Sequence, residues 1–103
     1  MRIFWPLLVR AAKLPDCAPR EWRASSSIPN SAEKTLTFEN NSPWTLEVVW
    51  MDFEGSPHQV NSMFESGGEH REDTYTGHVF EFRLDGKTID FHQVSPEVDV
   101  YKV

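Results

Sequence analysis

The sequence has little cysteine and no apolar run long enough to cross a membrane. Cys17 is the single cysteine among 103 residues, which excludes an internal disulfide and any two-cysteine metal or redox motif. The apolar stretch at residues 3–9 is interrupted by Pro6 and is far shorter than the roughly 20 residues that span a bilayer. No convincing small-x-small cleavage site follows it. We therefore expect no membrane association and no secretion signal, and we expect a cytoplasmic location.

Basic side chains are scarce after the first 23 residues. Residues 1–23 hold five basic and two acidic side chains, whereas residues 24–103 hold five basic and fourteen acidic ones. An acidic body repels phosphates, so we expect no nucleic-acid partner. Hydrophobic residues make up 39% of the chain and charged residues 25%, a composition typical of one small globular domain.

No stretch has the apolar stripe of an amphipathic helix. From residue 33 onward apolar and polar side chains alternate with a period of two, which indicates β-strands. Residues 1–32 contain four of the seven prolines and a run of three serines, and we expect an irregular N-terminal arm or extension that adds little stability. The predicted domain is residues 33–103.

Turn residues divide this domain into short strands. Asp85-Gly86 is a strong signal for a two-residue hairpin, after which Ile89 and Phe91 are both expected to point inward. Strands recur with turns about every ten residues, which predicts an all-β, small antiparallel sandwich of about six to eight strands. The expected strands lie within residues 34–40, 44–53, 58–64, 72–76, 78–84, 87–93 and 97–103.

Two sequence blocks resemble the β domain of the von Hippel-Lindau tumour suppressor family. The first runs from residue 38 to 57 and combines an Asn-x-Ser-Pro turn, a strand ending Val-Trp-x-x-Phe, and an acidic-Gly-x-Pro turn. The second, Thr74-Tyr75-Thr76-Gly77-His78-Val79-Phe80-Glu81-Phe82-Arg83, is similar to the family's Ser-Tyr-x-Gly-His-x-Trp-x-Phe-Arg strand. The resemblance covers residues 34–84, about half of the chain.

This resemblance implies a noncatalytic peptide-binding module. In the family, the β domain is the substrate receptor of a cullin-type ubiquitin ligase and binds a peptide that carries 4-hydroxyproline. By position, Trp50 matches the aromatic floor of the hydroxyproline pocket, Thr74 and His78 match the two groups that bind the 4-hydroxyl, and Phe80 stands where the family has a tryptophan wall. A hydroxyl and an imidazole can both donate and accept, so they favour hydroxyproline over proline.

Two departures limit what the resemblance implies. Val60 stands where the family has a tyrosine whose hydroxyl binds the ligand backbone. The sequence also lacks the helical domain and the Thr-Leu-x-x-x-Cys box that bind an elongin adaptor. We therefore expect a peptide or protein ligand, with hydroxyproline recognition as the leading hypothesis, and no elongin binding by this chain alone.

The sequence does not favour an enzyme, a cofactor or a metal site. The spacings of the four histidines match no common ligand motif, and solvated strand faces account for the carboxylates. No serine triad, glycine-rich phosphate loop or Cys-His pair stands out. The histidines are His58, His70, His78 and His92, and the carboxylates with the most suggestive spacing are Glu69, Glu72, Asp73 and Glu81.

A carbohydrate-binding or purely structural sandwich is the competing hypothesis. Trp44, Trp50 and Phe53 could stack on sugars or pack in the core, and an isolated His78 could be an ordinary hydrogen-bonded strand residue. A pocket that joins Trp50, Thr74 and His78 would favour peptide recognition. A flat, exposed row of aromatic side chains would favour carbohydrate binding.

Overall fold

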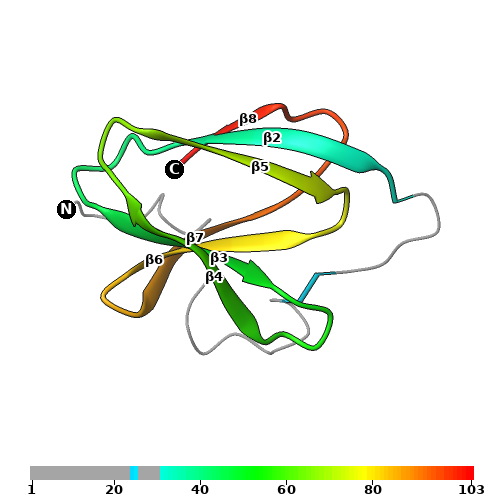
Figure 1. Ribbon diagram of the computed structural model, residues 1–103, viewed down its shortest axis with the longest axis horizontal. Coiled ribbons are helices and arrows are strands. Elements are labelled where there is room, and N and C mark those ends of the chain that lie inside the picture. Colours follow the sequence, from blue (N-terminus) through cyan, green and yellow to red (C-terminus); the bar gives the residue numbers. More distant parts are fainter. Residues whose placement is uncertain (1–23, 26–30) are drawn as a thin grey trace, which may run out of the picture.

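The described part of the chain, residues 24–25 and 31–103, is all-β in the computed structural model (Figure 1). It contains seven strands and no helix, so no helix there could cross a membrane. Every strand predicted from the alternation is present, although those expected at 44–53 and 97–103 are shorter and the one expected at 72–76 begins earlier. The strands are β2 (Glu33–Glu39), β3 (Leu46–Met51), β4 (Pro57–Phe64), β5 (Glu69–Tyr75), β6 (Val79–Leu84), β7 (Lys87–Gln93) and β8 (Val100–Lys102).

The strands form two sheets that pack as a sandwich (Figure 1). One sheet has the order β5-β2-β8 and the other the order β4-β3-β6-β7. Neighbouring strands are antiparallel as predicted, with the exception of β2 and β8, which are parallel. The chain leaves β7, crosses to the opposite sheet and meets β2 in the same direction, and Thr37 N–H donates to Asp99 O at this junction. Local alternation carries no information about such a crossing.

Aromatic side chains from both sheets fill the space between them. Phe82 of β6 is fully buried, and its ring centroid lies 4.9 Å from that of Phe38 on β2 and 5.9 Å from that of Tyr101 on β8. Apolar residues at alternate positions of β2, β3 and β6 complete this core, as the period of two predicts. Its buried members are Leu36, Phe38, Leu46, Val48, Phe64, Phe80, Phe82 and Val94.

The Asn40 side chain forms hydrogen bonds that connect the end of β2 with the end of β4 at one end of the sandwich. Its side chain is fully buried, and its Nδ2 donates to Trp44 O and Phe64 O at 2.8 Å each. Its Oδ1 accepts from the backbone N–H and the hydroxyl of Ser42 at 2.9 and 2.6 Å. The Asn-x-Ser-Pro turn therefore links the end of β2 to the end of β4 through satisfied buried hydrogen bonds.

A β-bulge in β7 corrects the expectation for Phe91. Phe82 faces Asp90, but the next residue of β6, Arg83, faces Thr88, so Ile89 is an extra residue in the pairing. Ile89 packs against the main core as expected, whereas Phe91 packs on the opposite face of the sheet. The prediction that both point inward was wrong because one inserted residue reverses the alternation that follows it.

Contacts with the two sheets begin before the predicted domain boundary. Ser25 is 4% exposed, and its backbone N–H donates to Asp52 O at 3.1 Å. Ser31 Oγ donates to Thr76 O at 2.8 Å, and Ala32 exchanges hydrogen bonds with Thr76. These residues therefore add bonds to the fold, although the sequence predicts an arm that adds little.

Candidate functional site

A hollow of about 210 Å³ lies where the edge strands of the two sheets meet. Strand β4 is the edge of the four-stranded sheet, and β5 is the edge of the three-stranded sheet. Trp50 of β3 and Phe80 of β6 also face the hollow. All four site residues named from the sequence are among those that line it, which are Trp50, Val60, Glu72, Asp73, Thr74, Tyr75, His78 and Phe80.

Trp50 lies between two imidazole rings. Its ring centroid is 5.2 Å from that of His58 and 5.6 Å from that of His78, with interplanar angles of 37° and 34°. The ring of Phe53 meets Trp50 edge-on at 6.2 Å. The indole N–H of Trp50 is buried and has no hydrogen-bond partner among the described residues. The indole ring of Trp50 therefore has aromatic neighbours on several sides, while its Nε1–H has no hydrogen-bond partner among the described residues.

A tight turn between β5 and β6 positions His78. The backbone N–H of His78 donates to Tyr75 O at 3.2 Å, and the intervening Gly77 has a φ of 94°. A side chain at this φ would be strained, so glycine suits the turn. Val94 holds the other side of the turn, because its N–H donates to His78 O at 2.8 Å and its carbonyl accepts from Gly77.

Thr74 and His78 form a polar pair inside the hollow. Thr74 Oγ1 lies 3.2 Å from His78 Nδ1, and Thr74 is 7% exposed. Burial lowers the pKa of His78 below its usual 6.5, which favours the neutral ring at neutral pH. A neutral imidazole has one donor and one acceptor nitrogen. The pair can therefore both donate a hydrogen bond to a third group and accept one from it.

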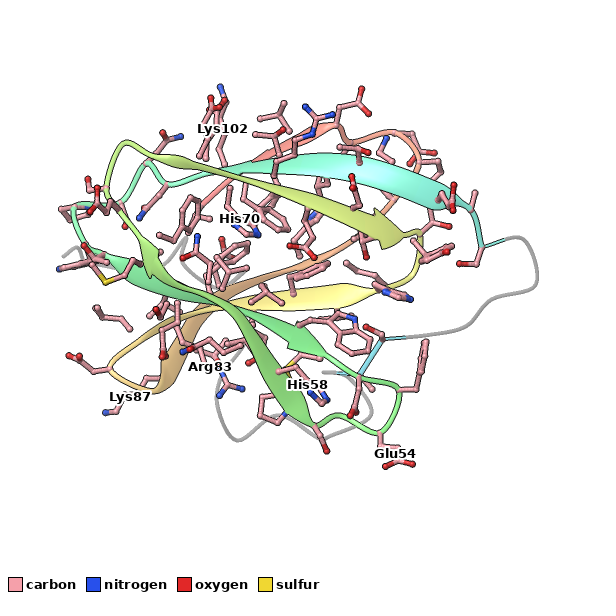
Figure 2. The ribbon with its side chains drawn as sticks, in the orientation of Figure 1. Glu54, His58, His70, Arg83, Lys87 and Lys102 are labelled. Atoms are coloured by element: carbon pink, nitrogen blue, oxygen red, sulfur yellow. The ribbon has the colours of Figure 1, made fainter. Side chains whose placement is uncertain are left out.

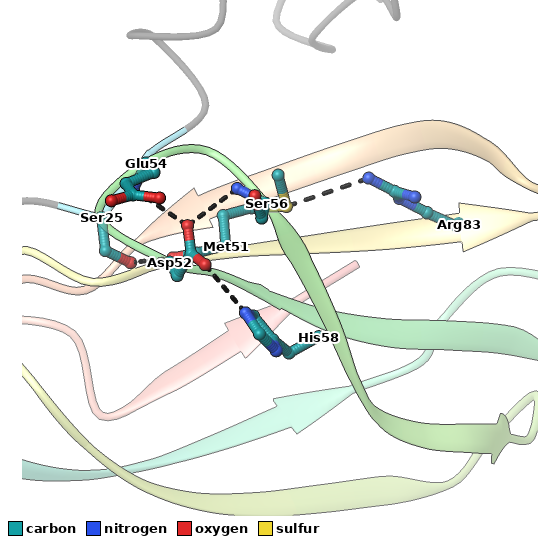
Figure 3. Close-up of polar contacts among 7 residues, drawn as sticks. All are labelled: Ser25, Met51, Asp52, Glu54, Ser56, His58 and Arg83. Atoms are coloured by element: carbon teal, nitrogen blue, oxygen red, sulfur yellow. Dashed lines mark hydrogen bonds and ion pairs between the residues drawn. The ribbon is translucent and has the colours of Figure 1, made fainter.

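The turn after β3 fixes the position of His58 through Asp52 (Figure 3). Asp52 Oδ1 accepts from the backbone N–H of Glu54 at 2.9 Å and of Ser56 at 2.8 Å, and Asp52 Oδ2 lies 2.9 Å from His58 Nε2. The hydrogen bond to His58, followed by the one from Ser56 N–H, lowers the pKa of Asp52 to about 2. The carboxylate is thus ionised at neutral pH and orients the imidazole that lies tilted against Trp50.

Apolar side chains surround the hollow at the surface. Phe53 is 53% exposed, Tyr75 44% and Val60 38%, and the rings of Phe53 and Tyr75 lie 5.4 and 5.6 Å from that of His78. Exposed apolar side chains gathered around a polar pair are typical of a binding surface. Phe80 differs from them, because it is only 1% exposed and belongs mainly to the core.

Sequence reasoning did not identify Tyr75 as a site residue. Strand alternation places Tyr75 on the face opposite Thr74, yet the turn at Gly77 brings the ring of His78 back toward it. The hydrogen bond from His78 N–H to Tyr75 O is the local feature that does so. The Tyr-x-Gly-His spacing was the available signal, since it fits a four-residue turn.

The chain matches a known protein family, the VHL beta domain, over residues 25–98, which is most of the chain. The chain belongs to the VHL β domain family. The match confirms the resemblance found in the two sequence blocks and extends it from Ser25 to Val98. Comparison with curated proteins gives no significant match.

The geometry of this VHL β domain does not form the aromatic row that carbohydrate binding predicts. Trp44 precedes β3 and Phe53 follows it, and a six-residue strand is about 20 Å long. Trp44 is therefore at the other end of the strand from the hollow. Among the described residues, no group of three His, Cys, Asp or Glu side chains could hold a metal ion.

Proposed function

We propose that this VHL β domain binds a peptide through the hollow at Trp50, with a 4-hydroxyproline ring against the indole and its hydroxyl between Thr74 and His78. The observation that supports this most is the Thr74–His78 pair, 3.2 Å apart in a hollow whose other walls are largely aromatic. Domains of this family recognise substrates for a ubiquitin ligase and perform no catalysis themselves. We propose the same noncatalytic role for this chain.

The chemistry of the polar pair suits a hydroxyl. When neutral His78 accepts the Thr74 proton at Nδ1, Nε2 carries the ring proton and can donate. Thr74 Oγ1 keeps lone pairs that can accept. A ligand hydroxyl can therefore donate to Thr74 and accept from His78, whereas proline can do neither. A proline ring in the same place would leave the Nε2–H of His78 and the free lone pairs of Thr74 Oγ1 without water or a partner.

A peptide fits the surroundings of the hollow better than an isolated small molecule. Edge strands β4 and β5 each have a single strand neighbour among the described residues, so backbone groups on their other sides are available to an extended peptide. The exposed side chains of Phe53, Val60 and Tyr75 offer apolar contacts to residues that flank the hydroxyproline. Val60 lacks the hydroxyl of the family's tyrosine, so we expect weaker binding than in the family.

Calorimetric titration with matched peptides tests this proposal. We expect a peptide containing 4-hydroxyproline to bind about 5- to 150-fold more tightly than the same peptide with proline, because one buried polar partner is worth about 1–3 kcal/mol. Equal affinities would show that the pair does not read the hydroxyl. Binding of an oligosaccharide but of neither peptide would favour the carbohydrate alternative instead.

The rim of the hollow favours ligands with basic residues beside the hydroxyproline. Glu72 and Asp73 line it, and a second hollow of about 400 Å³ that shares Asp73 adds Glu33. The single basic side chain lining either hollow among the described residues is that of Lys34. It is bound to the carboxylate of Asp99 and donates to a backbone carbonyl, so its charge is already matched. Net negative potential therefore remains at the rim.

We expect a peptide with lysines on both sides of hydroxyproline to bind more tightly than one with glutamates, by about 2- to 5-fold for each exposed charge pair. Raising the salt concentration should reduce the difference by screening. Asp73→Asn should reduce the difference in affinity between the lysine and glutamate peptides, because the amide keeps an acceptor for the Thr35 hydroxyl but loses the charge. Fluorescence anisotropy with labelled peptides would measure these affinities.

Asp85→Asn is the matched control for Asp73→Asn. Asp85 is exposed in the β6–β7 hairpin. In Figure 2, Lys87 marks this hairpin and Glu54 marks the β3–β4 turn, and the two lie far apart. The control removes the same charge and should leave the preference unchanged. Tighter binding of the glutamate peptide would contradict the proposed charge preference while leaving hydroxyl recognition intact.

A further inference from the structure

Ser25 is held at the end of the four-stranded sheet by three buried hydrogen bonds. Its Oγ donates to Met51 O and accepts from Val79 N–H at 2.8 Å, and its own N–H donates to Asp52 O at 3.1 Å. Figure 3 shows Ser25 beside Met51 and Asp52. The side chain thus bonds to two different strands, since Met51 belongs to β3 and Val79 to β6.

These bonds lie directly beside the proposed binding site. Met51 follows Trp50 in the chain, and Val79 follows His78. Met51 and Val79 face each other as the last pair of the β3–β6 ladder. The Ser25 hydroxyl therefore bridges the two strands at the end where they present Trp50 and His78 to the hollow.

A hydroxyl bridge holds two strands differently from a direct hydrogen bond. In a direct bond the N–H and C=O of facing residues lie about 2.9–3.0 Å apart, measured between nitrogen and oxygen. Here Val79 N–H and Met51 O are both bonded to the oxygen placed between them. Without that hydroxyl the two groups could bond to each other directly, and the ends of β3 and β6 would move closer.

We propose that Ser25 is a positioning residue for the hollow: its hydroxyl bridge keeps β3 and β6 at the spacing that places the rings of Trp50 and His78 5.6 Å apart around one ligand group. This inference rests on the proposed function for its binding consequence, although the positioning itself can be measured without ligand. The hydrogen bonds of the Ser25 hydroxyl to Met51 and Val79 are then energetically coupled to peptide binding. Such coupling is reciprocal, so peptide binding must also stabilise these hydrogen bonds.

The test uses the full chain and the variant Ser25→Ala. We expect the variant to fold, because the Val79 N–H and Met51 O that it frees face each other and can pair. In the absence of ligand, the NMR signals of the Trp50 indole N–H and the His78 ring protons should shift. Affinity for the hydroxyproline peptide should fall about fivefold or more, because a binding site tolerates only small displacements of its groups.

Ser42→Ala is the matched control. It also removes one partly buried hydroxyl, but that hydroxyl bonds to Asn40 near the start of β3, at the other end of this strand. It should lower stability without shifting the Trp50 and His78 signals. Ser25→Thr, which keeps a hydroxyl, should retain the ring signals of the original chain.

Two outcomes would overturn the positioning role. The first is Ser25→Ala with ring signals and peptide affinity unchanged, even if its melting temperature falls. The second, in the unmodified chain, is hydrogen exchange at the Ser25 amide that does not slow with saturating peptide. If the unmodified chain binds no peptide, the proposed function fails, and the ring signals of Ser25→Ala still decide whether Ser25 positions the two side chains.

Discussion

Replacing Phe82 by alanine is expected to lower the free energy of unfolding by about 3–5 kcal/mol, the largest effect on stability that we expect from one substitution. Phe82 is fully buried, and its ring contacts Phe38 from the opposite sheet, Phe64 from β4 and Tyr101 from β8. The substitution would leave a cavity bordered by three of the strands that close the sandwich. Urea denaturation followed by tryptophan fluorescence would measure the loss.

Phe53→Ala is the control for Phe82→Ala. The same ring is removed, but Phe53 is 53% exposed, so the change in stability should lie within about 0.5 kcal/mol. A cost below 1 kcal/mol for Phe82→Ala would contradict the arrangement of the core, because typical folded domains are stable by only about 5–15 kcal/mol and a ring of this burial contributes a large share.

Alternation and turn chemistry were sufficient to predict the strands of this domain. The hairpin at Asp85-Gly86 has φ values of 52° and 81°, the conformation for which that dipeptide is suited. Strand β3 is apolar on both faces, which is typical of a central strand, and it lies between β4 and β6. Such features depend on neighbours within a few residues, which is why the sequence alone carries them.

Features that depend on distant backbone groups were not predictable in this way. Ser25 bonds to backbone carbonyl and N–H groups of β3 and β6. Nearly every residue has such groups, so the sequence does not indicate which of them Ser25 contacts. The bulge at Ile89 and the parallel pairing of β8 are likewise set by how the sheets meet. The domain boundary at residue 33 stays a prediction, while the contacts and the family match both begin at Ser25.

Family resemblance, rather than residue pattern, selected the four proposed site residues. By pattern alone Trp50 and Phe80 are core aromatics, and Phe80 is indeed almost fully buried. Thr74 belongs to β5 and His78 lies just before β6, so their 3.2 Å contact depends on the turn at Gly77. Their convergence in one hollow is a property of the fold, and their role in binding is the proposal that remains to be measured.

The largest effect on binding is expected from His78→Ala. Removing the imidazole takes away one of the two groups proposed to hold the ligand hydroxyl and leaves Thr74 Oγ1 without its partner. We expect the affinity for the hydroxyproline peptide to fall about 5- to 150-fold, because an unpaired buried polar group costs about 1–3 kcal/mol. The affinity for the proline peptide should change much less, so the preference between the two should disappear.

His58→Ala is the matched control. The His58 ring lies 5.2 Å from the same indole, but its Nε2 lies 2.9 Å from Asp52 Oδ2 rather than beside Thr74. The substitution should cost stability at the β3–β4 turn and keep the preference for hydroxyproline. Loss of the preference for hydroxyproline in His58→Ala but not in His78→Ala would place the ligand hydroxyl beside His58. That result would refute its proposed position between Thr74 and His78.

The pH dependence of binding tests the same residue without mutation. Burial lowers the pKa of His78 below 6.5, so the neutral ring persists through neutral pH and its contribution is lost only as the pH falls through the lowered pKa. Protonation would fill Nδ1, which could then no longer accept from Thr74. The affinity for the hydroxyproline peptide should therefore be constant from pH 8 to about pH 6.5 and decline below that, with the decline absent in His78→Ala. An affinity that rises as the pH falls from 7 to 5 would show that the charged imidazole is the binding form, and the neutral Thr74–His78 pair would have to be abandoned as the hydroxyl site.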